Sequence, residues 1–270
     1  MKKWNFDNVE LSNGKGLTLE GFLYETHLHT IQASKCGKVR GADYIDYMKD
    51  KGYSGLIVTD HFFNGNSCVP HYLPWDYKVR MYVSGYKDAF TAAKGKDFDV
   101  IFGIEFNFNG DEYLIYGVDE QWLLENDDLL RLSRPEVYER VHQGGGVMIQ
   151  AHPYRERYYL SEINLTPSIC DGIEIYNAAN PDNQNARGYQ YALELGLPMT
   201  AGSDIHFFYD GAMGGMVLPH RIDTAQGYID AVMAGEATPV KVSDGSVTPV
   251  LELPELLETK DEPTLPVIRR

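Results

Sequence analysis

The sequence contains six short apolar runs, rich in β-branched residues, and each of them leads into a polar or ionisable residue. Such runs predict β-strands, and near-continuous apolar strands are typical of a parallel sheet that is buried on both faces. The runs are 22–24, 55–58, 99–104, 147–151, 172–176 and 197–203, and the polar residues after them include His27, Asp60, His61, Glu105, His152, Asn177 and Asp204. Each predicted strand therefore delivers a polar side chain at its carboxyl end.

Segments with helical periodicity separate these runs. The clearest is 78–94, where apolar residues recur at the spacing of one helix face, and weaker patterns predict helices over 42–51, 135–142, 183–195 and 225–234. Alternation of strands and helices predicts an α/β fold. An open doubly wound sheet gathers its site at one switch point, whereas a barrel collects functional residues from many strand ends. The distribution of polar residues therefore favours a barrel.

We expect one domain, 1–270, with a C-terminal extension packed on it. A chain of 270 residues can bury a sizeable core within one domain. After residue 236 the chain becomes rich in proline, which indicates that 236–270 is an extension lying over the domain and not a second domain.

Charge and composition exclude several classes of partner. The formal net charge of −15 would repel a phosphate backbone, so nucleic-acid binding is disfavoured. The sequence has no stretch of 18 apolar residues and no apolar h-region after Lys2 and Lys3, so we expect neither a membrane span nor secretion. Three cysteines, an odd number in a chain of this size, favour a reducing cytoplasm. The sequence is silent on the oligomeric state.

Candidate metal ligands are concentrated at the strand ends. His27 and His29 lie two residues apart, so on an extended chain both imidazoles point to one face and could hold one cation. Asp204 and His206 repeat this spacing. Glu105 ends an apolar strand, where a buried carboxylate needs a cationic partner, either a metal or an arginine.

Taken one at a time, these residues have ordinary explanations, such as surface histidines, a turn or a helix N-cap. Taken together, five strand ends carry nitrogen and oxygen ligands of the kind that bind zinc, iron or manganese. We therefore predict a multinuclear metal site formed by His27, His29, His61, Glu105, His152, Asp204 and His206.

The order of these motifs resembles that of the PHP family, the polymerase and histidinol phosphatase superfamily of metal-dependent phosphoesterases. The resemblance covers about residues 20–245, and Gly103-Ile104-Glu105 is similar to the strand whose carboxylate bridges two metals in that family. The segments similar to its four motifs are 26–30, 59–61, 151–153 and 202–206. The resemblance implies a distorted seven-stranded (β/α) TIM-like barrel in which 214–218 is the seventh strand.

The resemblance also implies a reaction, the hydrolysis of a small phosphate ester through a metal-bound hydroxide. The implied cofactors are two or three divalent transition metal ions, zinc, iron or manganese. One is expected on His27, His29, Glu105 and Asp204, a second on Glu105 with His152, and a third on His61 with His206. The substrate stays open among histidinol phosphate, a sugar phosphate, a nucleotide and an oligonucleotide.

Three residues are candidates for catalytic roles beside these metals. Glu105 is the expected bridging carboxylate, and Asp60 either protonates the leaving group or orients a ligand histidine. Arg155 follows the third motif and is expected to form a bidentate pair with phosphate. Its removal is expected to leave the metals bound. The other candidates for this phosphate contact are Arg157, Lys38 and Arg40.

The chain departs from the family pattern at two places. Fuller members carry another histidine soon after the first motif, near the position of Cys36, and trinuclear members carry one between the bridging glutamate and the third motif, the region of Glu112. Whether Cys36 or Glu112 replaces a missing ligand is left open. His142 is better explained by its place near a helix end, and His71 and His220 match no motif.

Two other functions are compatible with the residues. A metal-dependent amide or lactone hydrolase would use similar strand-end ligands to activate water for attack on a carbonyl. A non-catalytic PHP module would keep the fold for interaction or metal sensing, but the retained ligand set argues against this loss of activity. The residues of the four motifs favour the phosphoesterase.

Overall fold

The structure is a computed structural model, and it describes residues 21–257, 259 and 261–270. Lys2 and Lys3, on which the expectation about secretion rests, lie outside the described residues. The strands are β1 (Phe22–Leu28), β2 (Gly55–Val58), β3 (Asp99–Phe108), β4 (Asp111–Tyr116), β5 (Val147–Gln150), β6 (Ile163–Leu165), β7 (Gly172–Asn177), β8 (Met199–Gly202), β9 (Met213–Leu218), β10 (Thr238–Ser243), β11 (Ser246–Pro249) and β12 (Val267–Arg269).

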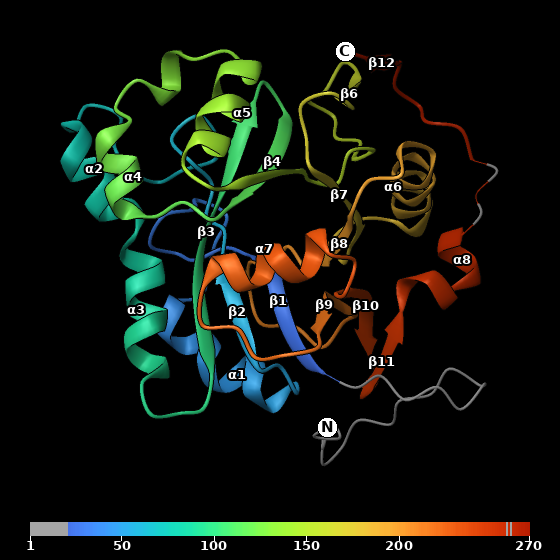
Figure 1. Cartoon of the computed structure of the whole chain (residues 1–270), viewed down its shortest axis with the longest axis horizontal. Helices are drawn as coiled ribbons and strands as arrows, with labels where there is room; N and C mark the ends of the chain where they lie inside the picture. The colour runs from blue at the N-terminus through green and yellow to red at the C-terminus, as the bar shows by residue number, and fades with distance from the viewer. Residues whose placement is uncertain (1–20, 258, 260) are drawn as a thin grey trace.

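The α-helices lie between and around these strands (Figure 1). The helix predicted over 78–94 is divided in two, with Val83 between its halves. The helices are α1 (Tyr44–Asp50), α2 (Trp75–Tyr82), α3 (Ser84–Ala93), α4 (Glu120–Glu125), α5 (Arg134–Gln143), α6 (Asp182–Leu195), α7 (Ala225–Met233) and α8 (Pro254–Leu257). Helix α6 ends at Gly196, whose φ of 66° is the left-handed conformation that glycine adopts without steric penalty.

Ten of the described strands form one mixed sheet in the order β11-β10-β9-β1-β2-β3-β4-β5-β7-β8. The β1–β2–β3 and β5–β7–β8 pairs are parallel, but β4 runs antiparallel between β3 and β5, and β9 runs antiparallel to β1. The α/β class is therefore confirmed, whereas the seven-stranded barrel is not. The expected seventh strand exists as β9, but its direction and the additional strands make a curled, open sheet.

The curl brings the end of β1 against the segment that follows β8. The backbone N–H of His29 donates to the Ile205 carbonyl at 3.0 Å, and the Ile205 N–H donates to the His27 carbonyl at 3.2 Å. Gly202 permits this approach, because a Cβ there would lie only 2.6 Å from the Cβ of His27. The first and fourth sequence motifs are therefore neighbours in space.

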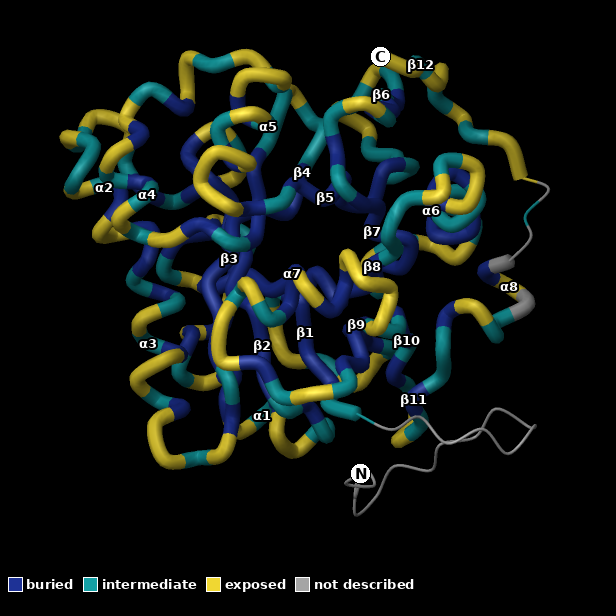
Figure 2. The backbone as a smooth tube through the Cα atoms, viewed as in Figure 1, coloured by how far each residue is buried: buried dark blue, intermediate teal, exposed yellow. Residues whose placement is uncertain are grey.

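Both faces of the sheet carry apolar side chains, as the near-continuous apolar runs predict. On β1, Leu23 and Tyr24 point to opposite faces and join two separate clusters of buried residues. Strands at the centre of the sheet are buried along most of their length, while the outer turns of the helices are exposed (Figure 2). The core holds the strands rigidly, so that the strand ends can present polar side chains in fixed positions.

Residues 236–270 contribute to two parts of the molecule. They first add β10 and β11 to one edge of the large sheet, and they end with β12, which pairs in parallel with β6. The chain end therefore lies beside the segment that follows the third motif. Arg270 Nη2 makes an ion pair with Glu162 Oε1 at 2.6 Å, and the Thr264 N–H donates to Glu156 Oε1 at 2.8 Å.

Within the described part of the chain, no helix is both long and apolar enough to cross a membrane. The three cysteines, Cys36, Cys68 and Cys170, are all free thiols. Cys36 and Cys68 lie in adjacent loops, where the Cys68 N–H donates to the Ala33 carbonyl at 2.8 Å, and only Cys170 is buried.

Candidate metal centre

The seven residues predicted as ligands all meet at one end of the sheet. They lie in or just after β1, β2, β3, β5 and β8, with Glu105 inside β3, which continues to Phe108; six of them are buried, while His206 is partly exposed. Their nitrogen and oxygen atoms form overlapping groups of three that are compact enough to hold a cation. The groups among the seven are His27 with His29 and Asp204, His27 with Glu105 and His152, and His29 with His61 and His206.

The first group lies where β1 meets the end of β8. His29 Nε2 is 3.1 Å and His27 Nε2 is 3.6 Å from Asp204 Oδ1, and His27 Nε2 is 3.1 Å from Glu105 Oε1. A tetrahedral cation about 2.1 Å from its ligands separates neighbouring ligand atoms by about 3.4 Å. The spacing of these four side chains therefore suits one cation.

The carboxylate of Glu105 lies between two sets of imidazoles. Its Oε1 is 3.1 Å from His27 Nε2 and 3.3 Å from His152 Nε2. Its Oε2 is 3.6 Å from His29 Nε2 and makes a close contact with His61 Nδ1. Each oxygen thus faces a different part of the site, which is the arrangement that a bridging carboxylate requires.

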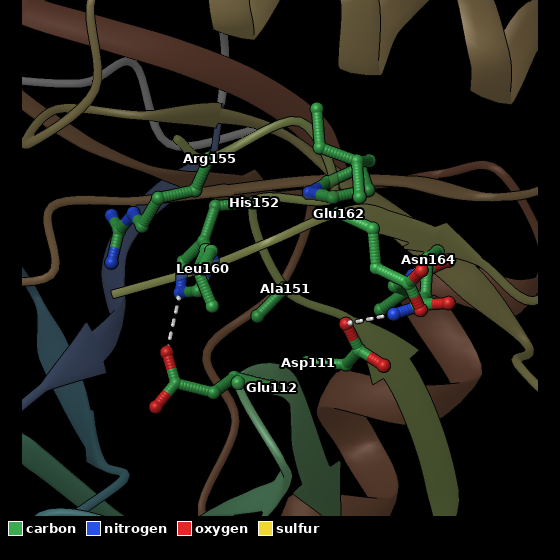
Figure 3. A pocket seen from close by; sticks show the side chains of 12 residues that line it. Asp111, Glu112, Ala151, His152, Arg155, Leu160, Glu162 and Asn164 are labelled. Atoms are coloured by element: carbon green, nitrogen blue, oxygen red, sulfur yellow. Dashed lines mark hydrogen bonds and ion pairs between the residues drawn. The ribbon is translucent and has the colours of Figure 1, made fainter. Parts of the chain in front are cut away.

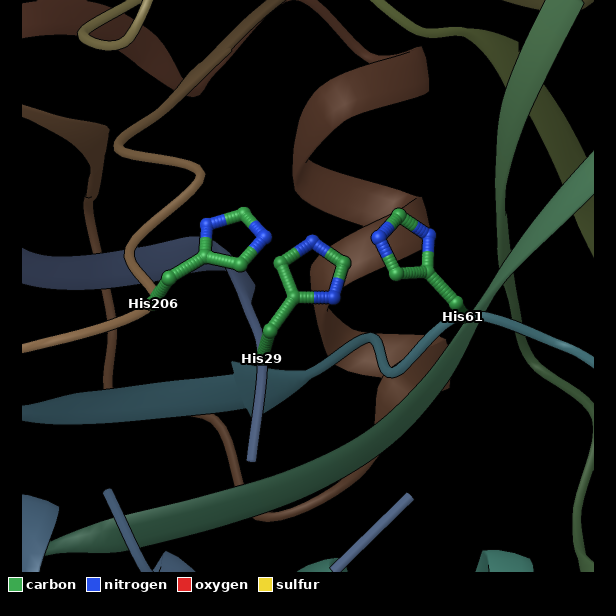
Figure 4. A group of neighbouring side chains, drawn as sticks. All are labelled: His29, His61 and His206. Atoms are coloured by element: carbon green, nitrogen blue, oxygen red, sulfur yellow. The ribbon is translucent and has the colours of Figure 1, made fainter. Parts of the chain in front are cut away.

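A third group consists of three histidines side by side (Figure 4). The ring centroid of His29 is 4.3 Å from those of both His61 and His206. Cys36 lies beside this group: burial raises the pKa of its thiol, but the neighbouring His206 and His61 lower it to about 6. Cys36 belongs to none of the candidate ligand groups among the described residues.

Four buried atoms at the centre of the site have no hydrogen-bond partner among the described residues. They are His27 Nε2, His29 Nε2, His61 Nδ1 and Glu105 Oε2. Leaving a buried polar atom unsatisfied costs about 1–3 kcal/mol, so four converging in one place need an explanation. Lone pairs on imidazoles and carboxylates are the donor set of Zn²⁺, Fe²⁺ and Mn²⁺, and the residues present therefore fit divalent metals.

Glu174, in the middle of β7, orients two of the predicted ligands. Its Oε1 is 2.9 Å from His27 Nδ1, and its Oε2 accepts a hydrogen bond from the His152 N–H at 3.0 Å. Holding a proton on His27 Nδ1 leaves Nε2 free to face the site. Burial lowers the pKa of His27, but the neighbouring carboxylates, Asp204 foremost, raise it well above its ordinary value. The position therefore favours positive charge.

Glu174 is not among the site residues predicted from the sequence, where only the polar residue after this strand, Asn177, was considered. The signal was a charged residue inside an apolar run, because a buried carboxylate in such a strand needs a partner. Asn177 itself supports the site, since its Nδ2 lies 3.1 Å from Glu174 Oε2 and 3.4 Å from Asp204 Oδ2.

Asp60 lies beneath the ligands and outside their groups. Its carboxylate accepts hydrogen bonds from the Thr30 N–H, the Thr30 hydroxyl and the Ser34 hydroxyl, each at 2.6 Å. Ser34 Oγ in turn lies 3.2 Å from His29 Nδ1 and accepts from the His61 N–H at 3.0 Å. Burial raises the pKa of Asp60 to about 6 despite these bonds. The geometry favours the orienting alternative over proton donation.

Arg155 is mostly covered by the site, with 12% of its side chain exposed, and is bound there by three side chains. Its Nη2 lies 2.7 Å from Asp204 Oδ2 and donates to Asn177 Oδ1 at 2.8 Å, while Nε donates to Asn180 Oδ1 at 2.7 Å. Nη1 makes no hydrogen bond with any described residue. The guanidinium therefore neutralises a predicted metal ligand and keeps one nitrogen for another partner.

The other cations expected near phosphate are less well placed. Arg40 is exposed and pairs with Asp88 at 3.1 Å, and Arg157 Nη1 donates to the Glu156 carbonyl at 2.9 Å. The exposed Lys38 lies beside the fourth motif, because its N–H donates to the His206 carbonyl at 2.7 Å. Arg155 is the best buried of the four.

The remaining histidines lie outside the site. His142 pairs with Asp171 at 2.9 Å near the end of α5, and His71 and His220 are exposed. None of the three belongs to a candidate ligand group among the described residues.

Two predicted ligands have backbone conformations that are uncommon for residues other than glycine. His152 has a φ of 30° and Asp204 a φ of 55°. Such conformations cost of order 1–3 kcal/mol and are found mostly at functional sites, where the surrounding structure holds them. The fold therefore holds His152 and Asp204 in strained backbone conformations that direct their side chains into the site.

Buried imidazoles and carboxylates that converge at the ends of strands in an α/β fold define a metal-dependent hydrolase as the class of protein. The chain belongs to the PHP family, because the PHP domain model matches residues 25–195. This confirms the resemblance derived from the motifs. No curated protein matches the sequence.

Several solved structures resemble the fold. One is a two-domain protein from Bacteroides vulgatus that contains a predicted PHP-like metal-dependent phosphoesterase; it has a TM-score of 0.64 and 15% identity, covering 88% of this chain and 69% of that one. Another is an amidohydrolase from Chromobacterium violaceum with bound sulfate, with a TM-score of 0.47 and 15% identity, covering 68% of this chain and 87% of that one. The first of these likenesses shows the shared fold.

Proposed function

We propose that this protein is a metal-dependent phosphoesterase that hydrolyses a small phosphate ester. The observation that carries the proposal is the convergence of seven buried or partly buried candidate ligands. Four of their buried atoms make no hydrogen bond, and a guanidinium nitrogen lies beside them. Membership in the PHP family supports the metal-dependent hydrolase class. The choice of a phosphate ester rests on Arg155 and on the charge of the site.

The site is strongly anionic without cations. Glu105, Glu174 and Asp204 are buried within contact distance of His27, and Arg155 is the cation that pairs with one of them. A phosphate dianion would be repelled by this arrangement. Two or three divalent cations would reverse the sign of the local charge, so binding of the substrate and binding of the metals should be linked.

The proposed metal positions follow the three groups. His27, His29, Asp204 and Glu105 would hold one cation, Glu105 and His152 a second, and His61 with His206 a third. When bound, such cations lower the pKa of water toward neutrality and neutralise charge on phosphoryl oxygens. Zinc, iron and manganese all suit these donors.

The chain's own residues prepare the site for this chemistry. Glu174 holds the proton of His27 on Nδ1, and Ser34 lies at Nδ1 of His29, so that both Nε2 atoms face inward. Arg155 would donate from Nη1 to a phosphoryl oxygen while Nη2 keeps Asp204 in place. These contacts exist before any ligand arrives, which reduces the reorganisation needed in the reaction.

The proposal is tested by the metal dependence of phosphate ester hydrolysis. Protein stripped by a chelator should be inactive toward p-nitrophenyl phosphate and a panel of phosphomonoesters, and Mn²⁺, Zn²⁺ or Fe²⁺ should restore activity. A variant with Ala at His29 should stay inactive after loading. The proposal fails if the loaded protein cleaves no phosphate ester; cleavage of lactones or amides instead would establish the carbonyl hydrolase, and inertness toward all substrates the non-catalytic module.

A further inference from the structure

Glu112 places a second carboxylate beside Glu105. It is the second residue of β4, opposite Asn107 of β3 in the antiparallel pair. Its Oε2 is 3.6 Å from His152 Nε2, and its Oε1 is 3.7 Å from His61 Nδ1. Figure 3 shows the Glu112 side chain directed at His152 from the opposite wall of the pocket.

Glu105 and Glu112 face the same two imidazoles. Glu105 also presents one oxygen to His152 Nε2, at 3.3 Å, and the other to His61 Nδ1. His61, Glu105 and Glu112 accordingly form a compact group of potential ligands. Two carboxylates so close together repel one another unless a positive charge lies between them.

Hydrogen bonding within the protein does not account for this pair. Glu112 accepts one bond, from Asn107 Nδ2 to Oε1 at 3.1 Å, and its Oε2 accepts none from the described residues, His152 Nε2 lying 3.6 Å away. His61 Nδ1 and Glu105 Oε2, both buried, face each other closely without making a hydrogen bond. The neighbouring Asp111, by contrast, is neutralised by Arg134. The unsatisfied atoms converge on the space that Glu112 faces.

We propose that Glu112 is a ligand of a cation that it shares with Glu105 and His61. This inference rests on the proposed function and deepens it by fixing the donor set of one position. Two carboxylates and one imidazole form a harder donor set than one carboxylate with imidazoles. The position should therefore have a lower ratio of Zn²⁺ to Mn²⁺ affinity than the same position with histidine at residue 112.

Three variants test the assignment, with a measurement of bound metal that does not depend on turnover. Glu112→Gln keeps the size of the side chain and removes the charge, and Glu112→His replaces the carboxylate by an imidazole. Glu162→Gln is the matched control, because Glu162 lines the same pocket but pairs with Arg270 at 2.6 Å. Circular dichroism and thermal melting establish that each variant is folded.

Metal-free proteins are titrated with Mn²⁺, and free Mn²⁺ is counted by its electron paramagnetic resonance signal; a parallel calorimetric titration uses Zn²⁺. We expect Glu112→Gln to lose one equivalent of Mn²⁺ or to bind it at least about 10-fold more weakly, since even residues that only orient ligands typically contribute 10–100-fold. Glu112→His should keep the stoichiometry and raise the ratio of Zn²⁺ to Mn²⁺ affinity. Glu162→Gln should match the wild type.

The assignment is wrong if wild type binds two or more equivalents and Glu112→Gln binds Mn²⁺ with the same stoichiometry and affinity. It is also wrong if Glu112→His leaves the Zn²⁺ to Mn²⁺ ratio unchanged. If the wild-type protein binds less than one equivalent, the proposed function fails together with the assignment. The first two results leave the metal-dependent function standing, so the two failures are distinguishable.

Discussion

The site has two walls that are built in different ways. The strand wall, His27, His29 and Asp204, lies in or directly after strands, and these side chains are at most 5% exposed. The loop wall, Glu112, His152 and Arg155, lies at a hairpin and at the start of the segment that connects β5 to β6. That segment includes Tyr158 and Tyr159, which are 99% and 64% exposed.

The two walls also differ in what holds them. In the strand wall, backbone hydrogen bonds between β1 and Ile205 fix the positions, and His27 and His29 each have a second polar partner at Nδ1. The segment that carries Arg155 is held from outside, by Glu156 with Thr264 and Glu162 with Arg270. The difference teaches that the first group of candidate ligands is held by the sheet itself, whereas the loop wall, which combines candidate ligands with Arg155, depends also on contacts with the end of the chain.

Removing one member of the strand wall should have the largest effect. His27→Ala deletes a side chain that lies between Glu105, Glu174 and Asp204, so the protein should lose at least one metal equivalent. Activity should fall by more than the 10–100-fold that is typical of residues that only orient a ligand. Elemental analysis and kcat/KM measure the two effects, with the exposed His220→Ala as the control. Full metal content in His27→Ala would contradict the role of the strand wall.

Arg155→Ala should show separately what Arg155 contributes to folding stability and what it contributes to catalysis. In metal-free protein it removes the arginine partner of the buried Asp204 carboxylate, which should lower the free energy of unfolding by about 3 kcal/mol. Bound cations neutralise Asp204, so the loss should be smaller in loaded protein, which should keep its full metal content. Denaturant unfolding with and without Mn²⁺ measures this difference.

In loaded Arg155→Ala, kcat/KM for phosphate esters should fall by about 10–100-fold, the equivalent of one hydrogen bond to a charged group. Lysine at this position should recover part of the loss, because it keeps the charge but not the planar geometry. Unchanged kinetics would place the phosphate contact elsewhere, at Arg157, Lys38 or Arg40. Equal loss of stability with and without metal would argue that Asp204 binds no cation.

Glu174→Gln should weaken metal binding and keep the fold. The amide can still accept from His27 Nδ1 but no longer stabilises positive charge there, so metal affinity should fall by about 10–100-fold. Calorimetric titration measures the change, and Glu194→Gln, an exposed glutamate that pairs with Arg269, serves as the control. An affinity equal to that of the wild type would show that Glu174 has only a structural role.

The smallest effect is expected from loosening the connection between the loop wall and the chain end. Glu156→Gln removes the charged acceptor for the Thr264 N–H, a contact at the surface that is worth about 0.2–1 kcal/mol. We expect about a two- to five-fold change in kcat/KM with no change in metal affinity. A change in metal affinity instead would mean that the contact with the chain end also positions the ligands of the loop wall.

The strand wall could be predicted from the sequence because it depends on local geometry. Alternation along a strand puts His27 and His29 on one face, and the end of an apolar strand marks Asp204. No knowledge of strand order is needed for either inference. The same reasoning found Glu105 and His152, and the structure brings all of these residues together.

The positions of Glu112 and Arg155 in the loop wall and the closure of the sheet could not be predicted in this way. Glu112 lies near the start of an antiparallel strand, and its position depends on the register between β3 and β4. Arg155 was assigned to substrate alone, because sequence spacing does not reveal that Asp204 lies 2.7 Å away. The barrel was predicted from strand ends, which say nothing of strand direction, and β4 and β9 run antiparallel.

The most direct test of the central claim is the number of metal ions bound by the wild-type protein. Metal-free protein should be reconstituted with Mn²⁺, Zn²⁺ or Fe²⁺, separated from free metal and measured by elemental analysis. The convergence of seven ligands predicts at least two ions per chain, because one tetrahedral cation takes only four. Less than one ion per chain after reconstitution with each metal would contradict the account.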